Sequence, residues 1–519
     1  MIKDFPFEEL RPGTAEAIRN IEKAFAGGKR FVLVNAATGA GKSGIAIWFA
    51  RKEKAVIVTP TKVLQRQYEN TPQFDREYTI FGKSNYDCGL KGYKHLTVDD
   101  APCCSDGVAR ACADSTPWKN QILAANPSST LKKLCSNAGH CEYYKLRSHL
   151  RYKPGAIVNY DLLTHLKLVH DAKSTAVVMD EAHTLIDKAR SVFGYKLSSN
   201  VVTRLLGAEA ARKHEEGPVV WLRRVETMAI IESQKEKDLR RGPKLNKFIS
   251  RLQVLAGLKL DDPNSFYIDD RGDTIDIKPL DIRYLKDNIF GNMKQVLLLS
   301  ATFPDNYREL LGIADEESEY INIPSSFPKE NRPAVFVQGL PAINWKTVLK
   351  KDHPSVKALD HIMEEHRTEK GIIHCANYKI FSQLQGLYKR DARFTWVDRG
   401  VDKNIVMSRH ENTDRASVLV SPSMMEGVDL KDDLARFQVM LKLPYGALDD
   451  YTKQLMAAFP GYYENDVITR IVQAYGRAVR SADDSAVFYI LDGAFDRLVT
   501  RNKSLFPKYF MEALGATRM

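Results

Sequence analysis

The chain has 519 residues, more than a single hydrophobic core usually holds, so three or four domains are expected. Hydrophobic residues make up 44% and charged residues 27%, and no run of about 18 apolar residues occurs, which argues against a membrane protein. The net charge of +11 favours a polyanionic partner such as nucleic acid, though only weakly. The first residues are acidic and lack an apolar segment, so they predict no signal peptide and a protein of the reducing cytoplasm.

Short apolar segments alternate with helical patterns in the first part of the chain, which predicts a parallel sheet. Strands are expected at 30–35, 55–59, 156–158, 176–179 and 295–299, with helices at 41–51 and 62–69. The alternation stops at Phe81 and resumes near Gly155. A second interruption, from Asp187 to Pro279, is charged and helical in period and ends in a strand-like stretch at 266–277. Both interruptions are interpreted as insertions into the first sheet.

A proline-rich hinge at 322–335 precedes a second alternation. Strands are expected there at 335–338, 371–375, 394–397, 417–421, 436–442 and 486–491. The predicted fold is therefore α/β, with two parallel-sheet domains. The first domain is assigned to 1–81, 151–187 and 280–325, its insertions to 82–150 and 188–279, and the second domain to 326–519.

A glycine-rich turn between the first strand and its helix predicts a phosphate-binding loop. The segment Ala36–Ser43 meets the pattern GxxxxGK[ST] except at Ala36. Small residues let backbone N–H groups surround a phosphate, the lysine reaches the β- and γ-phosphates, and the serine ligates Mg²⁺. The candidate nucleotide ligands are Thr38, Gly39, Ala40, Gly41, Lys42 and Ser43.

Two further groups complete a predicted ATP site. Asp180 and Glu181 end the strand at 176–179, where Asp180 would hold Mg²⁺ and Glu181 would orient the attacking water. Gln473, Arg477 and Arg480 lie on a helical pattern of the second domain, and the two arginines project from one helix face. From across a cleft they would stabilise the transferred phosphoryl charge. A solvated basic face is the alternative for this helix.

The motifs together resemble those of superfamily 2 helicases. TPTKVLQRQ (59–67), LLSATF (298–303), GIIHCANY (371–378) and SPSMMEGVDL (421–430) follow in the family's order. The fold that this resemblance implies is two RecA-like motor domains. It implies DNA contacts at Thr59, Asn377, Ser423 and Gly427, nucleotide contacts at Arg11, Gly427 and Asp429, and a role for His183 in linking nucleotide to motion. Thr14 stands where many relatives have glutamine, which leaves adenine specificity open.

Six of the seven cysteines lie between Cys88 and Cys141, and in a reducing cytoplasm such a cluster points to metal rather than to disulfides. The flanks of this insertion resemble the iron–sulfur helicases of the XPD/DinG type. The resemblance implies a structural [4Fe–4S] cluster on four cysteines. Cys88, Cys135 and Cys141 match the family best, and the fourth ligand is Cys103, Cys104 or Cys112, of which Cys104 is chosen. A zinc site and buried free cysteines are the alternatives.

The same resemblance makes the second insertion an arch-like domain, mainly helical, that borders a hole for single-stranded DNA. Lys83 and Tyr86 are predicted DNA contacts beside the first insertion, because cations and aromatic rings suit a single strand. Lys83 stands where relatives usually carry arginine.

The predicted function is an ATP-dependent DNA helicase that uses ATP, Mg²⁺ and a [4Fe–4S] cluster. It acts on single-stranded and forked duplex DNA, with 5′→3′ polarity implied by the family alone. Single-strand-binding, repair and replication proteins are further candidate partners, in a bacterial or viral-host cytoplasm. The alternative is a DNA translocase that displaces bound protein without processive unwinding. A non-enzymatic scaffold is disfavoured by the intact catalytic residues.

Overall fold

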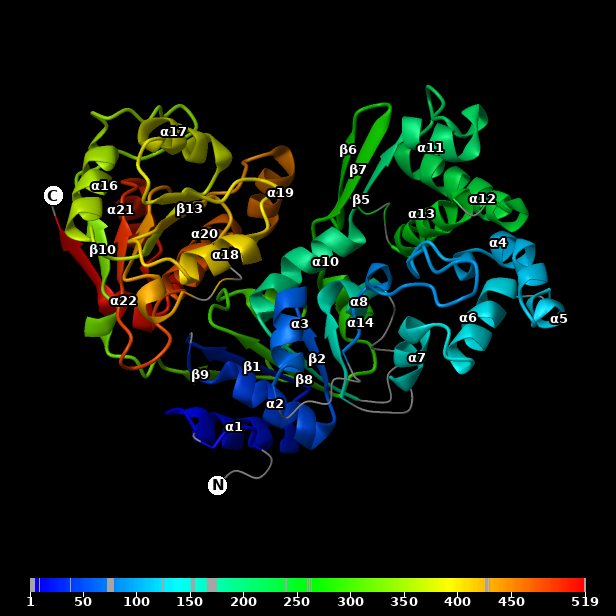
Figure 1. Cartoon of the computed structure of the whole chain (residues 1–519), viewed down its shortest axis with the longest axis horizontal. Helices are drawn as coiled ribbons and strands as arrows, with labels where there is room; N and C mark the ends of the chain where they lie inside the picture. The colour runs from blue at the N-terminus through cyan, green and yellow to red at the C-terminus, as the bar shows by residue number, and fades with distance from the viewer. Residues whose placement is uncertain are drawn as a thin grey trace.

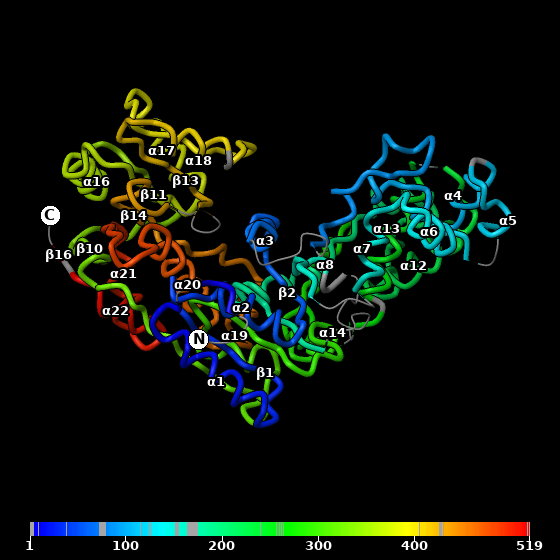
Figure 2. Tube along the Cα trace, turned by 60° about the horizontal axis from the view of Figure 1, so that its bottom comes forward, coloured from blue at the N-terminus to red at the C-terminus, as the bar shows by residue number. Residues whose placement is uncertain are grey.

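The computed structural model describes residues 5–8, 10–37, 39–71, 79–123, 126–150, 155–165, 175–238, 240–258, 260, 262, 264–424, 428 and 430–517. Figure 1 shows two α/β units side by side, with a third, largely helical body at the far side of the first unit. In Figure 2 the second unit and the helical body rise on either side of the first unit. None of the helices in these residues is long and apolar enough to cross a membrane.

The first unit is built on a six-stranded sheet in the order β3-β2-β4-β8-β1-β9, and all its strand pairs are parallel. Consecutive residues of β1 enter two different cores: Phe31 and Leu33 on one face, Val32 and Val34 on the other. A strand covered on both faces needs an unbroken apolar run, which is what its sequence provides. The strands are β1 (Phe31–Ala36), β2 (Val56–Thr59), β3 (Ile157–Asn159), β4 (Ala176–Met179), β8 (Gln295–Ser300) and β9 (Ser318–Ile323).

Short helices connect these strands and cover both faces of the sheet. They are α1 (Thr14–Ala26), α2 (Lys42–Glu53), α3 (Lys62–Glu69), α8 (Tyr160–His165), α10 (Leu185–Phe193), α14 (Lys286–Phe290) and α15 (Tyr307–Leu310). The helix α3 begins at an N-cap, where the Thr61 hydroxyl accepts a hydrogen bond from Leu64 N.

The second unit has a seven-stranded parallel sheet in the order β12-β13-β11-β14-β15-β10-β16. Its strands are β10 (Ala334–Val337), β11 (Gly371–His374), β12 (Phe394–Trp396), β13 (Val418–Ser421), β14 (Phe437–Met440), β15 (Val487–Ile490) and β16 (Leu514–Thr517). Its helices are α16 (Pro354–Glu365), α17 (Tyr378–Tyr388), α18 (Lys403–Glu411), α19 (Asp450–Ala458), α20 (Tyr462–Tyr475), α21 (Ala494–Arg501) and α22 (Lys508–Ala513).

The two insertions form the helical body on the right of Figure 1. The first holds α4 (Asp106–Ala111), α5 (Lys119–Ile122), α6 (Pro127–Asn137) and α7 (Glu142–His149), and the second holds α11 (Ser199–Leu206), α12 (Pro218–Lys235) and α13 (Arg241–Ala256). The two insertions pack closely against each other at Gly107, where an added Cβ atom would lie only 1.7 Å from the Glu236 carbonyl oxygen. An ion pair of 2.9 Å between Lys247 and Asp99 also joins them.

The predicted α/β class with two parallel sheets is confirmed, and the predicted strands recur within about one residue at each end, except for β14, which is three residues shorter than predicted. Two edge strands, β9 and β16, were not predicted. The strand β9 overlaps the start of the predicted hinge. Half of its side chains are exposed, so its sequence contains no continuous apolar run. The second insertion also contains an antiparallel sheet, β5-β7-β6, made of β5 (Tyr195–Ser198), β6 (Phe266–Asp270) and β7 (Thr274–Pro279).

Candidate nucleotide site and nucleic-acid interface

The phosphate loop leaves β1 and enters α2 through two glycines with left-handed backbone, Gly39 (φ 81°) and Gly41 (φ 88°). Such torsions are open to glycine at little cost. A Cβ on Gly39 would also lie 2.3 Å from the Phe327 ring of the interdomain hinge. Thr38, also predicted to bind phosphate, lies outside the described residues.

Lys42 lies across the loop that it follows, where Nζ donates a hydrogen bond of 3.1 Å to the Ala36 carbonyl oxygen. Burial lowers the pKa of Lys42, although the nearby carboxylates of Glu181 and Asp180 act in the opposite direction. The lysine and the two acids, predicted from separate motifs, therefore share one buried site.

Asp180 follows β4 and is only 4% exposed. Oδ2 accepts a hydrogen bond of 2.8 Å from the Tyr68 hydroxyl, and Oδ1 accepts one of 2.9 Å from Glu181 N. Burial, reinforced by the charge of Glu181, raises the pKa of Asp180 to about 6. Tyr68 also has a side-chain hydrogen bond with Ser43, so it lies between the two predicted Mg²⁺ ligands. Sequence reasoning missed Tyr68, because a tyrosine on the buried face of α3 carries no motif signal.

Glu181 has a left-handed backbone (φ 49°), an uncommon conformation for a residue with a side chain. Burial favours its neutral form, yet the charges of Lys42, His183, Arg477 and Arg480 together lower the pKa of Glu181. Within the described chain its Oε2 is buried and accepts no hydrogen bond. An ionised carboxylate with an unused buried acceptor atom can take a proton from, or orient, an attacking water.

A chain of polar contacts leads from this acid to the second domain. His183 lies 3.4 Å from Glu181 Oε2, and its Nδ1 lies 2.9 Å from the Ser300 hydroxyl. Ser300 Oγ in turn accepts a hydrogen bond of 3.0 Å from Thr302 N. The Thr302 hydroxyl accepts a hydrogen bond of 3.0 Å from Gln473 Nε2, on α20 of the second domain.

Arg477 and Arg480 lie beyond the end of α20 at Tyr475, in the turn that follows, so the prediction that both project from one helix face is wrong. Arg477 Nη2 donates a hydrogen bond of 3.1 Å to Gln473 Oε1, and both arginines act electrostatically on Lys42 and Glu181. Arg11 Nη1 contacts the carbonyl oxygens of Gly39 and Arg480 and so touches both domains. The predicted nucleotide residues from the two domains therefore meet at one interface. Gly427 and Asp429 lie outside the described residues.

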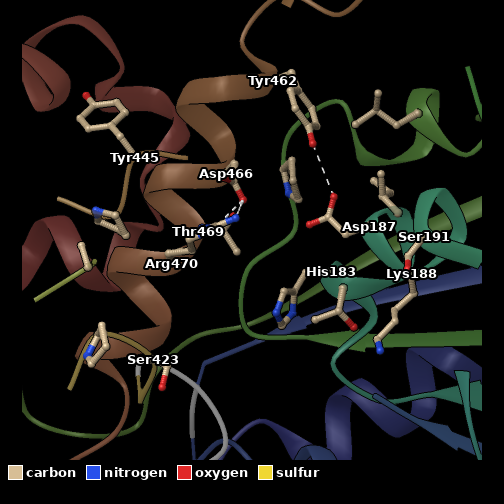
Figure 3. Close-up of a pocket in the computed structure, with 17 residues that line it drawn as sticks. His183, Asp187, Lys188, Ser191, Ser423, Tyr445, Tyr462, Asp466, Thr469 and Arg470 are labelled. Carbon is tan, nitrogen blue, oxygen red and sulfur yellow. Dashed lines mark hydrogen bonds and ion pairs between the residues drawn. The ribbon is translucent and has the colours of Figure 1, made fainter. Parts of the chain in front are cut away.

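A cavity of about 530 Å³ lies beside this interface, between α10 and α20 (Figure 3). His183, Asp187 and Lys188 line one wall, and Tyr462 and Arg470 line the other. The Tyr462 hydroxyl lies 3.5 Å from Asp187 Oδ1 and spans the cavity. Ser423, a predicted DNA contact, also lines the cavity, as does His183, which lies 3.4 Å from Glu181.

The predicted DNA contacts of the motor domains follow the carboxyl ends of parallel strands. The Thr59 side chain is fully buried, and its hydroxyl donates a hydrogen bond of 3.1 Å to the Thr61 carbonyl oxygen. Asn377 caps α17 by accepting a hydrogen bond of 3.0 Å from Ile380 N. The Ser423 carbonyl oxygen accepts a hydrogen bond of 3.2 Å from Lys403 Nζ. Their contacts with DNA stay predictions.

Comparison with known proteins finds helicases similar to this chain over most of its length. Residues 354–513 match the family described as helicase C-terminal domain, and residues 7–205 match the family described as type III restriction enzyme, res subunit. The ATP-dependent DNA helicase XPD of Sulfolobus acidocaldarius is 21% identical over 567 residues, which cover 99% of this chain and 98% of that protein. A solved structure of an XPD helicase covers 99% of this chain with a TM-score of 0.63 at 18% identity. The chain is similar to superfamily 2 helicases of the XPD/DinG type.

Not all members of the family are matched over their full length. The ATP-dependent DNA helicase DinG of Photobacterium profundum is 22% identical over 356 residues, or 63% of this chain and 47% of that protein. This chain thus spans about half of DinG but nearly all of XPD. The likeness to the solved XPD structure confirms the predicted α/β fold with two RecA-like domains.

The cysteine-rich insertion folds so that distant cysteines approach. All six of its thiols are free and buried. Cys141 N donates a hydrogen bond of 3.2 Å to the Cys135 carbonyl oxygen, and Gly89 N donates one of 3.0 Å to the His140 carbonyl oxygen, which joins the Cys88 and Cys141 segments. Burial, followed by the neighbouring Cys141 and Cys88, raises the pKa of Cys135 to about 12.

The fourth predicted ligand, Cys104, differs from the other cysteines. Its hydrogen bond with Cys103 and the nearby Lys83 and Lys132 lower the pKa of Cys104 to about 7, against the effect of burial. Cys112 instead accepts a hydrogen bond of 2.9 Å from the Tyr93 hydroxyl. In the described part of the chain no three Cys, His, Asp or Glu side chains form a ready metal site. Cysteine thiolates are the usual ligands of iron–sulfur clusters, so the side chains present fit such a cluster. The cluster itself stays a proposal.

The two DNA contacts predicted beside this insertion, Lys83 and Tyr86, lie in different environments. Lys83 Nζ lies 5.9 Å from the centre of the Tyr144 ring and is partly exposed. Tyr86 is 9% exposed, and its hydroxyl accepts a hydrogen bond of 3.0 Å from Phe81 N. Tyr86 therefore packs within the insertion, 5.6 Å from the Tyr143 ring, and of the two Lys83 is the more accessible to DNA.

Proposed function

We propose that the protein is an ATP-dependent DNA helicase that translocates on single-stranded DNA, 5′→3′, and unwinds forked duplex. The observation that carries the proposal is the interface where Gln473 contacts Thr302 and both arginines face Lys42 and Glu181. ATP bound there would touch both motor domains, so its hydrolysis would change the contact between them. DNA-binding groups on both domains would then move relative to each other.

Each residue has a defined role in the proposed hydrolysis. Lys42 and the loop amides bind the phosphates, while Ser43 and Asp180 would hold Mg²⁺, whose charge neutralises the phosphate oxygens. Glu181 orients the attacking water through Oε2. Arg477 and Arg480 stabilise negative charge on the transferred phosphoryl group. Gln473 would couple a change at the nucleotide to Thr302 through their hydrogen bond, and from Thr302 through Ser300 to His183.

The proposal includes a structural [4Fe–4S] cluster on Cys88, Cys104, Cys135 and Cys141. Buried thiols that approach from three separated segments support it, as does the length of chain that XPD shares with this protein. The cluster would tie the segments of the first insertion together beside the DNA path. All seven cysteines are free, in line with a reducing cytoplasm, in a bacterium or a virus-infected cell.

Phosphate release with and without single-stranded DNA tests the enzymatic part. DNA should strongly stimulate ATP hydrolysis by the wild-type protein. The Lys42→Ala variant should lose ATP hydrolysis while it keeps DNA binding. Glu181→Gln should bind Mg²⁺–ATP but hydrolyse it at least about 100-fold more slowly. DNA-stimulated hydrolysis at the wild-type rate in Lys42→Ala would refute the assignment.

Strand displacement on forks with a 5′ or a 3′ tail tests unwinding and polarity, beside displacement of streptavidin from biotinylated single strands. Unwinding of 5′-tailed forks is expected. Streptavidin displacement without unwinding would instead show a protein-displacing translocase. Iron and acid-labile sulfide, measured on anaerobically purified protein, should each approach about four per chain, and zinc or no metal would refute the cluster.

A further inference from the structure

Aromatic and basic side chains form an exposed row on the second motor domain, after the carboxyl ends of β10, β11 and β12. We call this row the basic–aromatic edge; it consists of Trp345, Lys346, Tyr378, Lys379, Arg399 and Lys403. Tyr378 is partly buried and the other five are exposed. Of these residues only Tyr378 belongs to one of the helicase-like segments, as the last residue of GIIHCANY (371–378).

Trp345 is the outermost ring of this edge and is 77% exposed. The chain has five tryptophans, of which Trp48 and Trp221 are buried and Trp118 and Trp396 are partly buried. Placing the largest apolar side chain in water gives up the stabilisation that burial would provide. A single exposed ring would need no explanation, but this one stands on a turn whose backbone is fixed by several hydrogen bonds.

The turn that carries Trp345 is fixed by hydrogen bonds. Within it, Lys346 N donates a hydrogen bond of 2.8 Å to Asn344 Oδ1, and Asn344 N donates one of 2.9 Å to the Thr347 hydroxyl. The turn is also tied to α17, because Leu349 N donates a hydrogen bond of 2.8 Å to Gln383 Oε1 and Lys379 Nζ contacts the Trp345 carbonyl oxygen. The ring is therefore presented by an ordered backbone.

Cations surround the rings along the edge. Lys346 Nζ lies 5.1 Å from the centre of the Trp345 ring, and the Arg399 guanidinium lies 4.1 Å from the centre of the Tyr378 ring. Exposed cations beside the exposed ring of Trp345 and the partly buried ring of Tyr378 suit a ligand that combines phosphates with flat bases, which is a single-stranded nucleic acid.

The edge joins the predicted DNA contacts of this domain. Lys379 lies in the first turn of α17, which Asn377 caps, and Lys403 Nζ bonds to the Ser423 carbonyl oxygen. One continuous surface thus runs from the interdomain cavity, past Ser423 and Asn377, to Trp345. A strand bound at the two motif residues would reach the tryptophan by continuing along this surface.

We propose that Trp345 is a base-stacking residue for single-stranded DNA at the outer end of the basic–aromatic edge. The inference rests on the proposed function and extends it to a contact that no helicase motif contains. The neighbouring cations bind phosphate, and the tryptophan stacks on a base of any sequence.

Equilibrium binding of two oligonucleotides tests this, one of oligo(dT) and one of equal length made of abasic nucleotides. Trp345→Leu keeps an apolar side chain but loses the ring, so it should bind oligo(dT) roughly tenfold more weakly. Its affinity for the abasic strand should not change. Its salt dependence should also match wild type, because the number of phosphate contacts is unchanged.

Val348→Ala is the matched control, since Val348 is 57% exposed in the same turn. It should bind both oligonucleotides like wild type. Trp345→Phe should retain most of the affinity for oligo(dT) and lose the DNA-dependent quenching of tryptophan fluorescence. Equal binding of oligo(dT) by wild type and Trp345→Leu would overturn the inference, as would an equal loss on both oligonucleotides. Absence of oligo(dT) binding by wild type would overturn the proposed function as well.

Discussion

The Tyr68 hydroxyl holds the carboxylate of Asp180 through a hydrogen bond of 2.8 Å and also bonds to Ser43. Tyr68 is 3% exposed, so its ring cannot easily turn away. One phenol on α3 thereby fixes the relative positions of the two predicted Mg²⁺ ligands, which come from α2 and from the end of β4.

Replacing Tyr68 with phenylalanine should weaken Mg²⁺ binding by about tenfold or more, because side chains that orient a metal ligand commonly contribute that much. The measurement is the Mg²⁺ dependence of fluorescent ADP binding, alongside the Mg²⁺ dependence of hydrolysis. Tyr160→Phe is the matched control: its hydroxyl donates a hydrogen bond of 3.0 Å to the Asp180 backbone carbonyl and not to the carboxylate. An unchanged Mg²⁺ titration in Tyr68→Phe would contradict the role.

The fourth cluster ligand can be decided between Cys104 and Cys112. Nearby Lys83 and Lys132 favour the thiolate of Cys104, whereas Cys112 already accepts a hydrogen bond from Tyr93. Cys104→Ser should therefore lose most of its iron and its acid-labile sulfide. Cys112→Ser should retain both. Iron loss in Cys112→Ser alone would reverse the assignment, and Cys103→Ser completes the comparison.

The parts of the fold and site predicted from the sequence are those that local pattern encodes. Strands β1 and β4 were predictable because burial on both faces demands unbroken apolar runs. Asp180 was predictable because it directly follows β4, and Lys42 because it closes the glycine-rich pattern between β1 and α2. β9 was not predictable, because this edge strand has exposed residues and its apolar and polar residues do not alternate regularly. Tyr68 and Trp345 were missed for a different reason. Their roles depend on which element packs beside them, and nothing within a few residues records that.

A buried histidine should make folding sensitive to acid. His374 ends β11 and is fully buried, and burial lowers the pKa of His374 to about 4. The unfolded chain has an ordinary histidine pKa near 6.5 and binds more protons below that pH. The stability contributed by the neutral ring is therefore present above about pH 6.5 and is lost as the pH falls towards 4.

The maximum loss is of the order of 3 kcal/mol from this one group. Thermal unfolding at a series of pH values, for wild type and His374→Gln, isolates it from the other titrating side chains. The variant should be less sensitive than wild type between about pH 6.5 and 4. Identical pH profiles would show that His374 does not titrate in this way.

The helix α19 of the second motor domain anchors that domain to the first, next to the end of the second insertion. Tyr451, Leu455 and Phe459 lie on one face of this segment, and the latter two are buried in the same core as the first domain. The Tyr451 hydroxyl donates a hydrogen bond of 2.6 Å to the Pro279 carbonyl oxygen, where β7 ends. The next helix, α20, contains Gln473 in its last turn and is followed by the two arginines, so this anchor fixes the far end of the helix that leads to the predicted catalytic contacts.

Leu455→Ala should loosen the anchor, because removal of a buried leucine side chain costs about 2–5 kcal/mol. We expect a larger radius of gyration in small-angle scattering without nucleotide and fewer base pairs unwound per ATP, with DNA binding retained. Leu448→Ala is the control, since Leu448 precedes α19 and is 54% exposed. If both variants unwind DNA with the wild-type yield per ATP, α19 is a passive contact and the Gln473–Thr302 interface alone couples the two motor domains.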